Sequence, residues 1–470
     1  MKARAAVEGA LARIEALEAE IGALLDVDEE GARTLADKLD REPAPRGPLH
    51  GVPFALKANL CWRGHLTGAA SRILDGYRPP YSATAIERLI AAGAIPLAIT
   101  NMDEFAFGSS GENSSFGATR NPWDLSRTAG GSSSGSAAAV AAGFVPFALG
   151  SDTGGSARQP AALCGVSGFK PSYGRISRRG LIAFAPSLDT VGVLGDSIER
   201  IEQVLACVSG HDERDATSLA LPPLALEAPR EHLRGLRIGV PKEWDAELCD
   251  QGARDRIRAA LEALHALGAE LVSVSLPLTL HANATYQVVS ACEAASQLAR
   301  YDGVRYGSRE SCDGTLQGMI AQTRGSSFGP ESRRRILLGT ALTSDEGSPS
   351  YEHAARVRRR IVDELHAIFE RVDLLASATA PEVAFRLGER SGDSARMHHS
   401  DLLAVPASLA GLPAASVPCG TCTTDGVELP VGLQLCGAPR ADARVLSTAR
   451  CFQAATRHHL ARAPLTGALP

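Results

Sequence analysis

Small hydroxyl-bearing residues gather between residues 101 and 189, where glycine and serine form short runs and charged residues are sparse. Two of these runs read GGSSSG at 130–135 and SDTGGS at 151–156. Apolar segments flank them, AAAVAAG at 137–143 and FVPFALG at 144–150. Flexible Gly/Ser linkers do not normally lie between buried elements. The pattern therefore favours a buried site built from serine hydroxyls over a pair of spacers.

Several common motifs of glycine and serine are absent from these runs. A phosphate loop needs G-x-x-x-x-G-K-[ST], and no lysine follows Gly135. A G-x-S-x-G nucleophile elbow is absent at Ser132 and at Ser156. A histidine base is not favoured either, because these histidines lie in segments with no Gly/Ser signature: His50, His65, His211, His265 and His281.

A buried lysine is the remaining base for serine chemistry without histidine. Lysine is charged at neutral pH, so it must be desolvated before it can accept a proton. Lowering its pKa from about 10.4 to near 7 takes roughly 4–5 kcal/mol of differential environment. Lys57 directly follows the apolar run VPFAL at 52–56. We expect that run to be a buried strand that carries Lys57 at its end; a surface lysine after an edge strand is the alternative.

Three separated blocks resemble the amidase signature family in their order and spacing. They are GVPFALKAN around Lys57, GGSSSGS at 130–136 and GSDTGGSARQPAALCGVSGFKPSYGRIS at 150–177. The resemblance implies that Lys57 is the base and that Ser132, after a cis peptide bond, relays the proton. It also implies that Ser156 is the nucleophile.

The turn that contains Ser156 also suits the binding of an oxyanion. With Ser156 as the nucleophile, the backbone N–H groups of Thr153, Gly154 and Gly155 are expected to converge on the developing negative charge, and one such donor is worth about 3–4 kcal/mol. Pro160 follows closely and suits the first turn of a helix.

Further blocks resemble, more narrowly, the A subunits of glutamyl-tRNA(Gln)/aspartyl-tRNA(Asn) amidotransferases. These blocks lie at 100–124, 301–307, 334–340 and 405–420. In that group a tyrosine, an arginine and an aspartate hold glutamine, and they match Tyr286, Arg335 and Asp401. A cation suits the α-carboxylate and an anion suits the α-ammonium. Two other roles stay open: a solvated helix face for Arg335 and a helix N-cap for Asp401.

This resemblance implies the glutaminase subunit of a heterotrimer. Glutamine would be hydrolysed through an acyl-serine, and ammonia would pass to a partner that uses ATP and Mg²⁺ to activate Glu-tRNA(Gln) or Asp-tRNA(Asn). B- and C-type subunits would be the partners, the B-type would bind most of the tRNA, and this chain would hold no cofactor. The alternatives are a stand-alone amidase for small aliphatic or aryl amides, which needs neither Arg335 nor Asp401, and a non-catalytic scaffold.

The charge of the chain is consistent with a partner that holds the RNA. The 470 residues include 48 lysines and arginines against 53 aspartates and glutamates, a net charge of −5. Such a balance gives no general basic field for gripping nucleic acid. No run of 18 apolar residues predicts a membrane span. Glu8, Glu15 and Glu18 interrupt the N-terminus where a signal peptide would be apolar, so we expect a cytoplasmic protein.

The ten cysteines are scattered along the chain. Cys419 and Cys422 form one C-x-x-C, but no second Cys or His pair follows at zinc spacing. We therefore expect reduced thiols and no metal site.

Helical and strand patterns alternate along the chain, which predicts an α/β fold. The resemblance implies a single large domain, with a mixed central sheet covered by helices on both faces. We expect an N-terminal helical segment at 1–45, a core with the catalytic residues at 46–200, and the rest of the sheet and the substrate pocket at 234–460. The expected strands are 52–56, 95–99, 144–149, 236–240, 270–274, 372–377 and 430–436; the expected helices are 83–92, 253–267, 353–370 and 441–455.

A further segment rich in glycine and serine lies at residues 324–332. Residues 324–332 read RGSSFGPES, and we expect a mobile loop there beside the active site.

Overall fold

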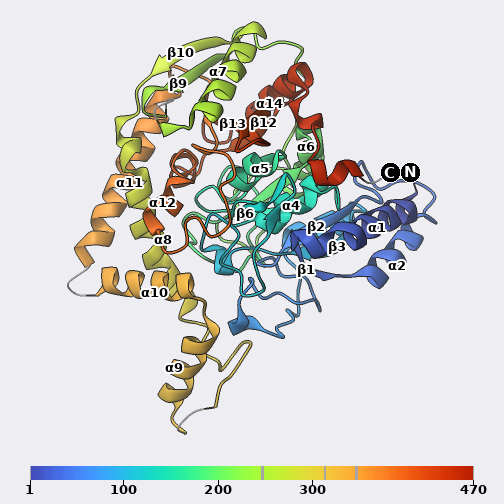
Figure 1. Ribbon diagram of the computed structural model, residues 1–470, viewed down its shortest axis with the longest axis vertical. Coiled ribbons are helices and arrows are strands. Elements are labelled where there is room, and N and C mark those ends of the chain that lie inside the picture. Colours follow the sequence, from blue (N-terminus) through green and yellow to red (C-terminus); the bar gives the residue numbers. More distant parts are fainter. Residues whose placement is uncertain (1, 245–247, 312–313, 345–347, 469–470) are drawn as a thin grey trace.

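An eleven-stranded mixed β-sheet forms the centre of the computed structural model, which describes residues 2–244, 248–311, 314–344 and 348–468 (Figure 1). In spatial order its strands are β1 (Leu24–Val27), β3 (Ile95–Thr100), β2 (Pro53–Lys57), β6 (Phe147–Asp152), β8 (Thr190–Gly195), β7 (Ser167–Lys170), β12 (Ala414–Thr424), β13 (Val427–Gly437), β11 (Leu374–Ala378), β9 (Arg237–Pro241) and β10 (Glu270–Val274). A separate two-stranded sheet consists of β4 (Arg120–Asn121) and β5 (Asp124–Thr128).

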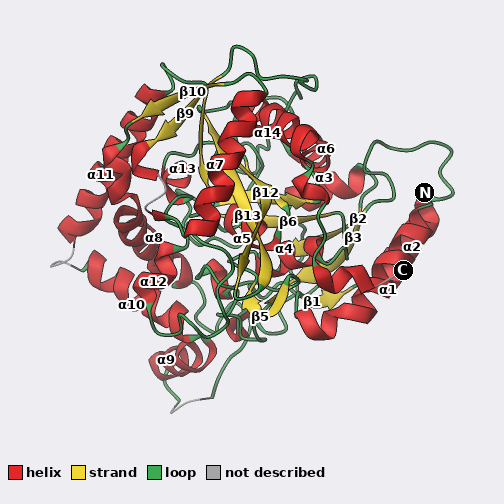
Figure 2. Cartoon of the chain, turned by 45° about the horizontal axis from the view of Figure 1, so that its top comes forward, coloured by secondary structure: helices red, strands yellow, loops and turns green. Residues whose placement is uncertain are grey.

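Helices surround this sheet (Figure 2). They are α1 (Ala3–Ile21), α2 (Glu29–Leu39), α3 (Thr84–Ala91), α4 (Ser134–Ala141), α5 (Arg158–Cys164), α6 (Ile198–Val208), α7 (Gln251–Ala266), α8 (Ala282–Leu298), α9 (Leu316–Ser327), α10 (Pro330–Thr343), α11 (Ser348–Ile368), α12 (Ser394–His399), α13 (Val405–Leu409) and α14 (Asp442–Thr456). Within the described ranges, none of them combines the length and the apolar character that crossing a bilayer requires.

Alternate residues of the central strands belong to two different hydrophobic cores. In β2, Phe54 and Leu56 pack in the core that includes α3, α6, α7 and α14, whereas Ala55 packs in the core built with α1, α2 and α4. Strand β6 repeats the pattern with Phe147 and Ala148. Successive side chains of a strand point to opposite faces, so the centre of the sheet is buried on both sides. The predicted α/β fold is confirmed.

The expected elements lie close to the observed ones, with three clear differences. The expectation missed the strands β1, β4, β5, β7, β8 and β12 and the helices α6, α12 and α13. It also gave no helices between 282 and 343, where α8, α9 and α10 lie. Residues 324–332 are not a loop, because α9 continues to Ser327 and α10 begins at Pro330. Proline is favoured in the first turn of a helix. The segment bounds 1–45, 46–200 and 234–460 stay a prediction.

A buried ion pair ties the end of β6 to elements far along the chain. Arg158 and Asp152 are both fully buried, with Nη2 to Oδ1 and Nε to Oδ2 each at 2.9 Å. Arg158 Nη1 also donates to the carbonyl of Ala404 at 3.0 Å and to Gln434 Oε1 at 2.6 Å. The turn that follows Asp152 is thereby fixed against the region before α13.

We expect Arg158→Met to lower the free energy of unfolding by about 3–5 kcal/mol, because Asp152 would be left as an unpaired buried charge. The double variant Arg158→Met/Asp152→Asn should regain part of this loss. Denaturant unfolding of the three proteins measures both effects. A double variant less stable than the single one would contradict this account of the pair.

Candidate active site

Lys57 lies at the edge of the sheet where three parallel strands end. It is the last residue of β2, which runs parallel to β3 and β6. The carboxyl ends of these strands therefore meet, and Ser151 of β6 comes next to Lys57. The lysine is fully buried, and its Nζ lies 2.8 Å from Ser132 Oγ and 2.9 Å from the hydroxyls of Ser133 and Ser151. The expected buried strand end is confirmed.

Burial lowers the pKa of Lys57 to about 7, although the carboxylates of Asp103, Asp152 and Asp189 act in the opposite direction. Near neutral pH a large fraction of Lys57 is therefore uncharged. A neutral Nζ carries a lone pair, so it can take a proton from a hydroxyl that it contacts.

Ser132 follows a cis peptide bond between Gly131 and Ser132, as the family resemblance implied. A Cβ at position 131 would lie 2.1 Å from Asp103 Oδ2, so this position has room only for glycine. Asp103 is itself buried and accepts backbone N–H groups from Gly111 and Asn113 at 3.0 Å. The carboxylate thus holds the loop that packs against the cis peptide.

Ser156 lies in the turn between β6 and α5 and is 6% exposed. Its carbonyl accepts the N–H of Ser133 at 3.0 Å, which joins the turn to the serine run. Among the described residues, none accepts a hydrogen bond from the backbone N–H groups of residues 153–156. These donors are free to bind a developing oxyanion. No direct bond joins the Ser132 and Ser156 hydroxyls in this part of the structure; such contacts often tighten only when substrate binds.

Two of the three residues expected to hold substrate, Tyr286 and Asp401, lie against this turn, and the third, Arg335, acts electrostatically on both. Tyr286 of α8 packs on the turn, since a Cβ at Gly154 would lie 2.7 Å from its Cζ. A Cβ at Gly155 would lie 3.4 Å from Asp401 Oδ1. Arg335 of α10 contributes to the electrostatic environment of both Tyr286 and Asp401.

Arg335 and Asp401 each present one buried polar atom without a partner among the described residues. The side chain of Arg335 is 4% exposed, and its Nε donates to Glu331 Oε1 at 2.8 Å while Nη1 bonds to nothing. Asp401 accepts the hydroxyl of Ser109 through Oδ2, while Oδ1 has no partner. Buried polar atoms are normally satisfied, so these two atoms could each bind a group of opposite charge on a ligand.

The two alternative roles are therefore wrong. Arg335 does not lie on a solvated helix face, since its neighbour Arg334 is 39% exposed while Arg335 points inward. Asp401 does not cap a helix with its side chain, because α13 begins at Val405 and the Asp401 carboxylate bonds to Ser109.

Burial raises the pKa of Asp401 to about 7, and the hydrogen bond from Ser109 partly opposes this rise. Burial also raises the pKa of Tyr286, whose phenol stays neutral at physiological pH. A bound ammonium group would favour the ionised form of Asp401, because an opposite charge lowers a carboxyl pKa.

Sequence reasoning missed several residues of this site. Ser133 and Ser151 contact Lys57 alongside Ser132, and Ser109 bonds Asp401. All three lie in the serine-rich stretch from 101 to 189, so that composition was the available signal. Composition cannot tell which hydroxyl of a run points at the lysine.

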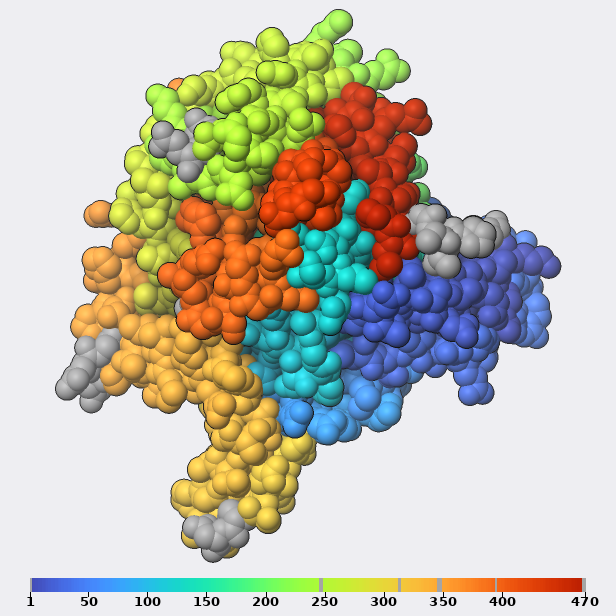
Figure 3. Space-filling view, in the orientation of Figure 1, coloured from blue at the N-terminus to red at the C-terminus, as the bar shows by residue number. Residues whose placement is uncertain are grey.

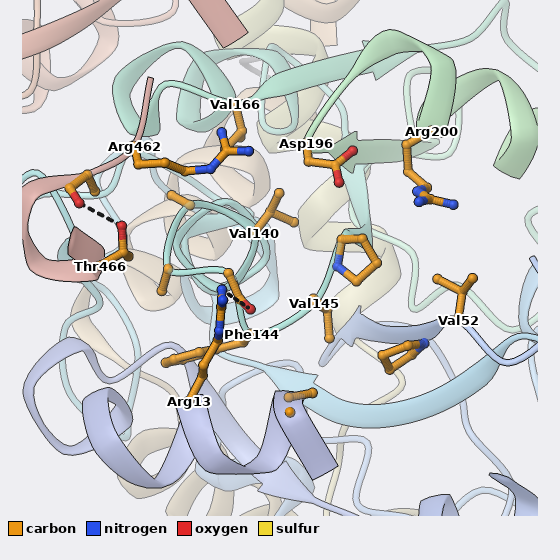
Figure 4. Close-up of a pocket in the computed structure, with 18 of the residues that line it drawn as sticks. Arg13, Val52, Val140, Phe144, Val145, Val166, Asp196, Arg200, Arg462 and Thr466 are labelled. Atoms are coloured by element: carbon orange, nitrogen blue, oxygen red, sulfur yellow. Dashed lines mark hydrogen bonds between the residues drawn. The ribbon is translucent and has the colours of Figure 1, made fainter. Parts of the chain in front are cut away.

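A cavity of about 670 Å³ lies elsewhere, between α1, the segment that joins α4 to β6, α6 and the C-terminal segment (Figure 4). None of the residues expected at the active site lines it. In the described ranges, no three His, Cys, Asp or Glu side chains come together in a way that could hold a metal ion.

The mixed sheet and the lysine–serine cluster beside a glycine-rich turn are the fold and site of a serine amidase. The chain matches the Amidase family over residues 5–446, so it belongs to that family.

Within this family, the chain is similar to individual proteins of known kind. The chain is 48% identical over 465 residues to the A subunit of the glutamyl-tRNA(Gln) amidotransferase of Symbiobacterium thermophilum, covering 98% of this chain and 94% of the relative. The crystal structure of the corresponding protein from Thermotoga maritima is 37% identical with a TM-score of 0.78, covering 96% of this chain and 91% of that one.

The peptide amidase of Stenotrophomonas maltophilia superimposes equally well. It is 30% identical with a TM-score of 0.81, and the match covers 97% of this chain and 94% of that one. Enzymes with different substrates thus share this fold, so the fold alone does not determine the substrate. The choice of substrate must therefore depend on the residues that contact it.

We expect hydrolysis of a simple amide by the isolated chain to rise with pH, with a midpoint near 7, because only neutral Lys57 accepts a proton. Lys57→Arg should lower kcat by about 10²–10⁴-fold, since arginine stays charged. The exposed Lys242→Arg is the matched control. A Lys57→Arg enzyme with wild-type turnover would show that another group takes the proton.

Proposed function

We propose that this chain is the glutaminase subunit of a tRNA-dependent amidotransferase. The buried, unpartnered atoms Arg335 Nη1 and Asp401 Oδ1 carry the proposal, because their charges match the α-carboxylate and α-ammonium groups of glutamine and Asp401 lies beside the Ser156 turn. The identity of 48% with a protein of this kind over 98% of the chain supports it.

In the first half of the reaction, neutral Lys57 accepts a proton from Ser132 while Ser132 accepts one from Ser156. Ser156 Oγ then attacks the side-chain amide carbon of glutamine. The N–H groups of Thr153, Gly154 and Gly155 stabilise the oxyanion. The tetrahedral adduct collapses, the C–N bond breaks, and the protonated Lys57 returns a proton through Ser132 to the leaving nitrogen as ammonia.

In the second half, a water molecule takes the role that Ser156 had in the first half, as the nucleophile that loses a proton. Lys57 and Ser132 remove a proton from the water, which attacks the glutamyl ester. Ser156 leaves with a proton returned along the same path, and glutamate is released. No step needs a metal ion or a cofactor in this chain.

The ammonia serves a reaction on a partner. The proposal assigns ATP and Mg²⁺ to a B-type subunit that activates Glu-tRNA(Gln) or Asp-tRNA(Asn), and it includes a C-type subunit in a cytoplasmic heterotrimer. The net charge of −5 supports leaving most of the tRNA contact to the partner. Hydrolysis of small amides by the chain alone is the second candidate, and the peptide amidase likeness favours it.

Ser156→Ala should abolish hydrolysis while the protein stays folded. Intact-mass spectrometry with a slowly turned over amide should show an acyl adduct on the wild-type chain and none on the variant, because the ester forms on Ser156 Oγ. An adduct mapped to Ser132 or Ser133 would overturn this assignment.

Arg335→Ala and Asp401→Asn should each lower kcat/KM for glutamine by about 30-fold or more, since each removes one partner of a desolvated charge contact. Hydrolysis of an amide without α-amino and α-carboxylate groups should change far less. The ratio of the two kcat/KM values, measured in the assembled complex with tRNA, cancels losses from misfolding.

Arg333→Ala is the matched control, because Arg333 lies on the same helix and is exposed. If the ratio stays unchanged for both active-site variants, the glutamine proposal fails and only amidase activity stands.

A further inference from the structure

The segment Glu104–Ser109 contacts both charged residues of the substrate site without belonging to the catalytic cluster. It reads EFAFGS and lies within the block at 100–124 whose role the mechanism leaves unassigned. Its backbone is unusual, because Phe105 and Ala106 have φ angles of +49° and +65°. Non-glycine residues adopt such angles at a cost of about 1–2 kcal/mol each. Strain of this kind persists only where surrounding contacts enforce it.

Glu104 holds the start of the helix that carries Arg335. Its carboxylate is 2% exposed and accepts hydrogen bonds from the hydroxyls of Ser71 and Ser332. It also accepts the N–H of Gly329 at 2.9 Å. Gly329 and Ser332 are the N-cap and the third residue of α10. An anion at a helix N-terminus is favourable, so this contact fixes the first turn of α10, and Arg335 follows less than one turn later.

Two aromatic side chains of the segment pack under the same region. The guanidinium carbon of Arg335 lies 5.9 Å from the ring centre of Phe107, within the range of a cation–π contact. Phe105 packs on Phe328, between α9 and α10, with ring centres 5.7 Å apart. Helix α9 projects from the body of the molecule (Figure 3), so the segment supports the point where this projection joins α10.

The last residue of the segment contacts the opposite charge. Ser109 donates its hydroxyl to Asp401 Oδ2, which leaves Oδ1 free for ligand. The Ser109 carbonyl accepts from Gln159 Nε2 at 3.0 Å, and Gln159 belongs to α5, directly after the Ser156 turn. One six-residue segment therefore connects the two charges to each other and to the nucleophile.

From these contacts we propose that Glu104–Ser109 is the specificity element for α-amino-acid amides, with Glu104 and Ser109 as positioning residues for Arg335 and Asp401. The proposal rests on the proposed function, because it takes Arg335 and Asp401 as the groups that hold the α-carboxylate and α-ammonium. An amide without these two groups is hydrolysed without help from the segment.

The test is a comparison of glutamine with a simple amide in the assembled complex with tRNA. Glu104→Gln keeps the shape but cannot accept all three hydrogen bonds, so KM for glutamine should rise about tenfold or more while kcat changes by less than about threefold. Kinetics on the simple amide should be unchanged. Ser332→Ala removes one donor to the same carboxylate and should give a smaller shift in the same direction.

A double-mutant comparison separates positioning from a general structural effect. In an Arg335→Ala background, Glu104→Gln should have no further effect on kcat/KM for glutamine, because its only route to the substrate is through Arg335. Glu112→Gln is the matched control, since Glu112 lies in the same block and bonds Gly388 instead of α10. It should behave like the wild type.

Ser109→Ala gives an independent readout through pH. The charges of Asp152, Arg335 and Arg158 act on Asp401, the Tyr286 phenol lies within its electrostatic reach, and the Ser109 bond lowers its pKa. Removing the hydroxyl should shift the acid limb of glutamine kcat/KM to higher pH and leave that of the simple amide in place.

The outcomes distinguish failure of the specificity element from failure of the proposed glutaminase function. If Arg335→Ala itself leaves the glutamine-to-amide ratio unchanged, the proposed function fails. If Arg335→Ala lowers the ratio but Glu104→Gln and Ser332→Ala do not, or if Glu104→Gln adds its full effect in the Arg335→Ala background, the specificity element is refuted. Equal losses on both substrates would likewise refute it, because they would indicate damage to the whole site.

Discussion

Complete removal of Lys57 from water is the constraint on which the rest of the site depends. The lysine works as a base only where water cannot solvate its ammonium form, and this requires β2 to be covered on both faces. The two hydrophobic cores meet this requirement because each covers one face of the strand. Large side chains such as Phe54 face one layer of helices, and small ones such as Ala55 let the other layer approach closely. Three hydroxyls at 2.8–2.9 Å then replace the lost water around Nζ.

The turn that contains Ser156 depends on contacts with residues far along the chain. Arg158, itself fully buried, links Asp152 at one end of the turn to Gln434 and to the carbonyl of Ala404. Tyr286 packs against the turn from α8. The sheet order explains how residues so far apart in sequence meet, because β7 and β12 are neighbours in the middle of the sheet and join its N-terminal and C-terminal strands. The lysine–serine cluster and the residues proposed to contact substrate thus come from different parts of the chain, and one sheet holds them together.

The sequence allowed prediction of the features that local backbone chemistry determines. Lys57 could be placed because an apolar strand ends at it, and the Gly-rich turns marked where a serine could approach a backbone donor. Strand β8 (TVGVLG) was not predicted because its glycines are typical of a turn. It is a strand because it pairs with β6 in antiparallel fashion, and this pairing is a tertiary contact. The start of α10 inside the expected loop at 324–332 has a similar origin, since Glu104 supplies an acceptor for its N-cap from more than 200 positions away. No local pattern encodes that contact.

The arrangement of Arg335 and Asp401 has a consequence for the end of the catalytic cycle. In the proposed function both residues bind groups that are identical in glutamine and in glutamate, so their contribution is the same before and after the amide is broken. Binding of this uniform kind lowers the free energy of the enzyme–product complex as much as that of the enzyme–substrate complex. Glutamate therefore competes with glutamine for the same contacts, and only the new carboxylate beside Ser156 distinguishes the two. Release of product, rather than capture of substrate, is the step that tight recognition at this end of the site would slow.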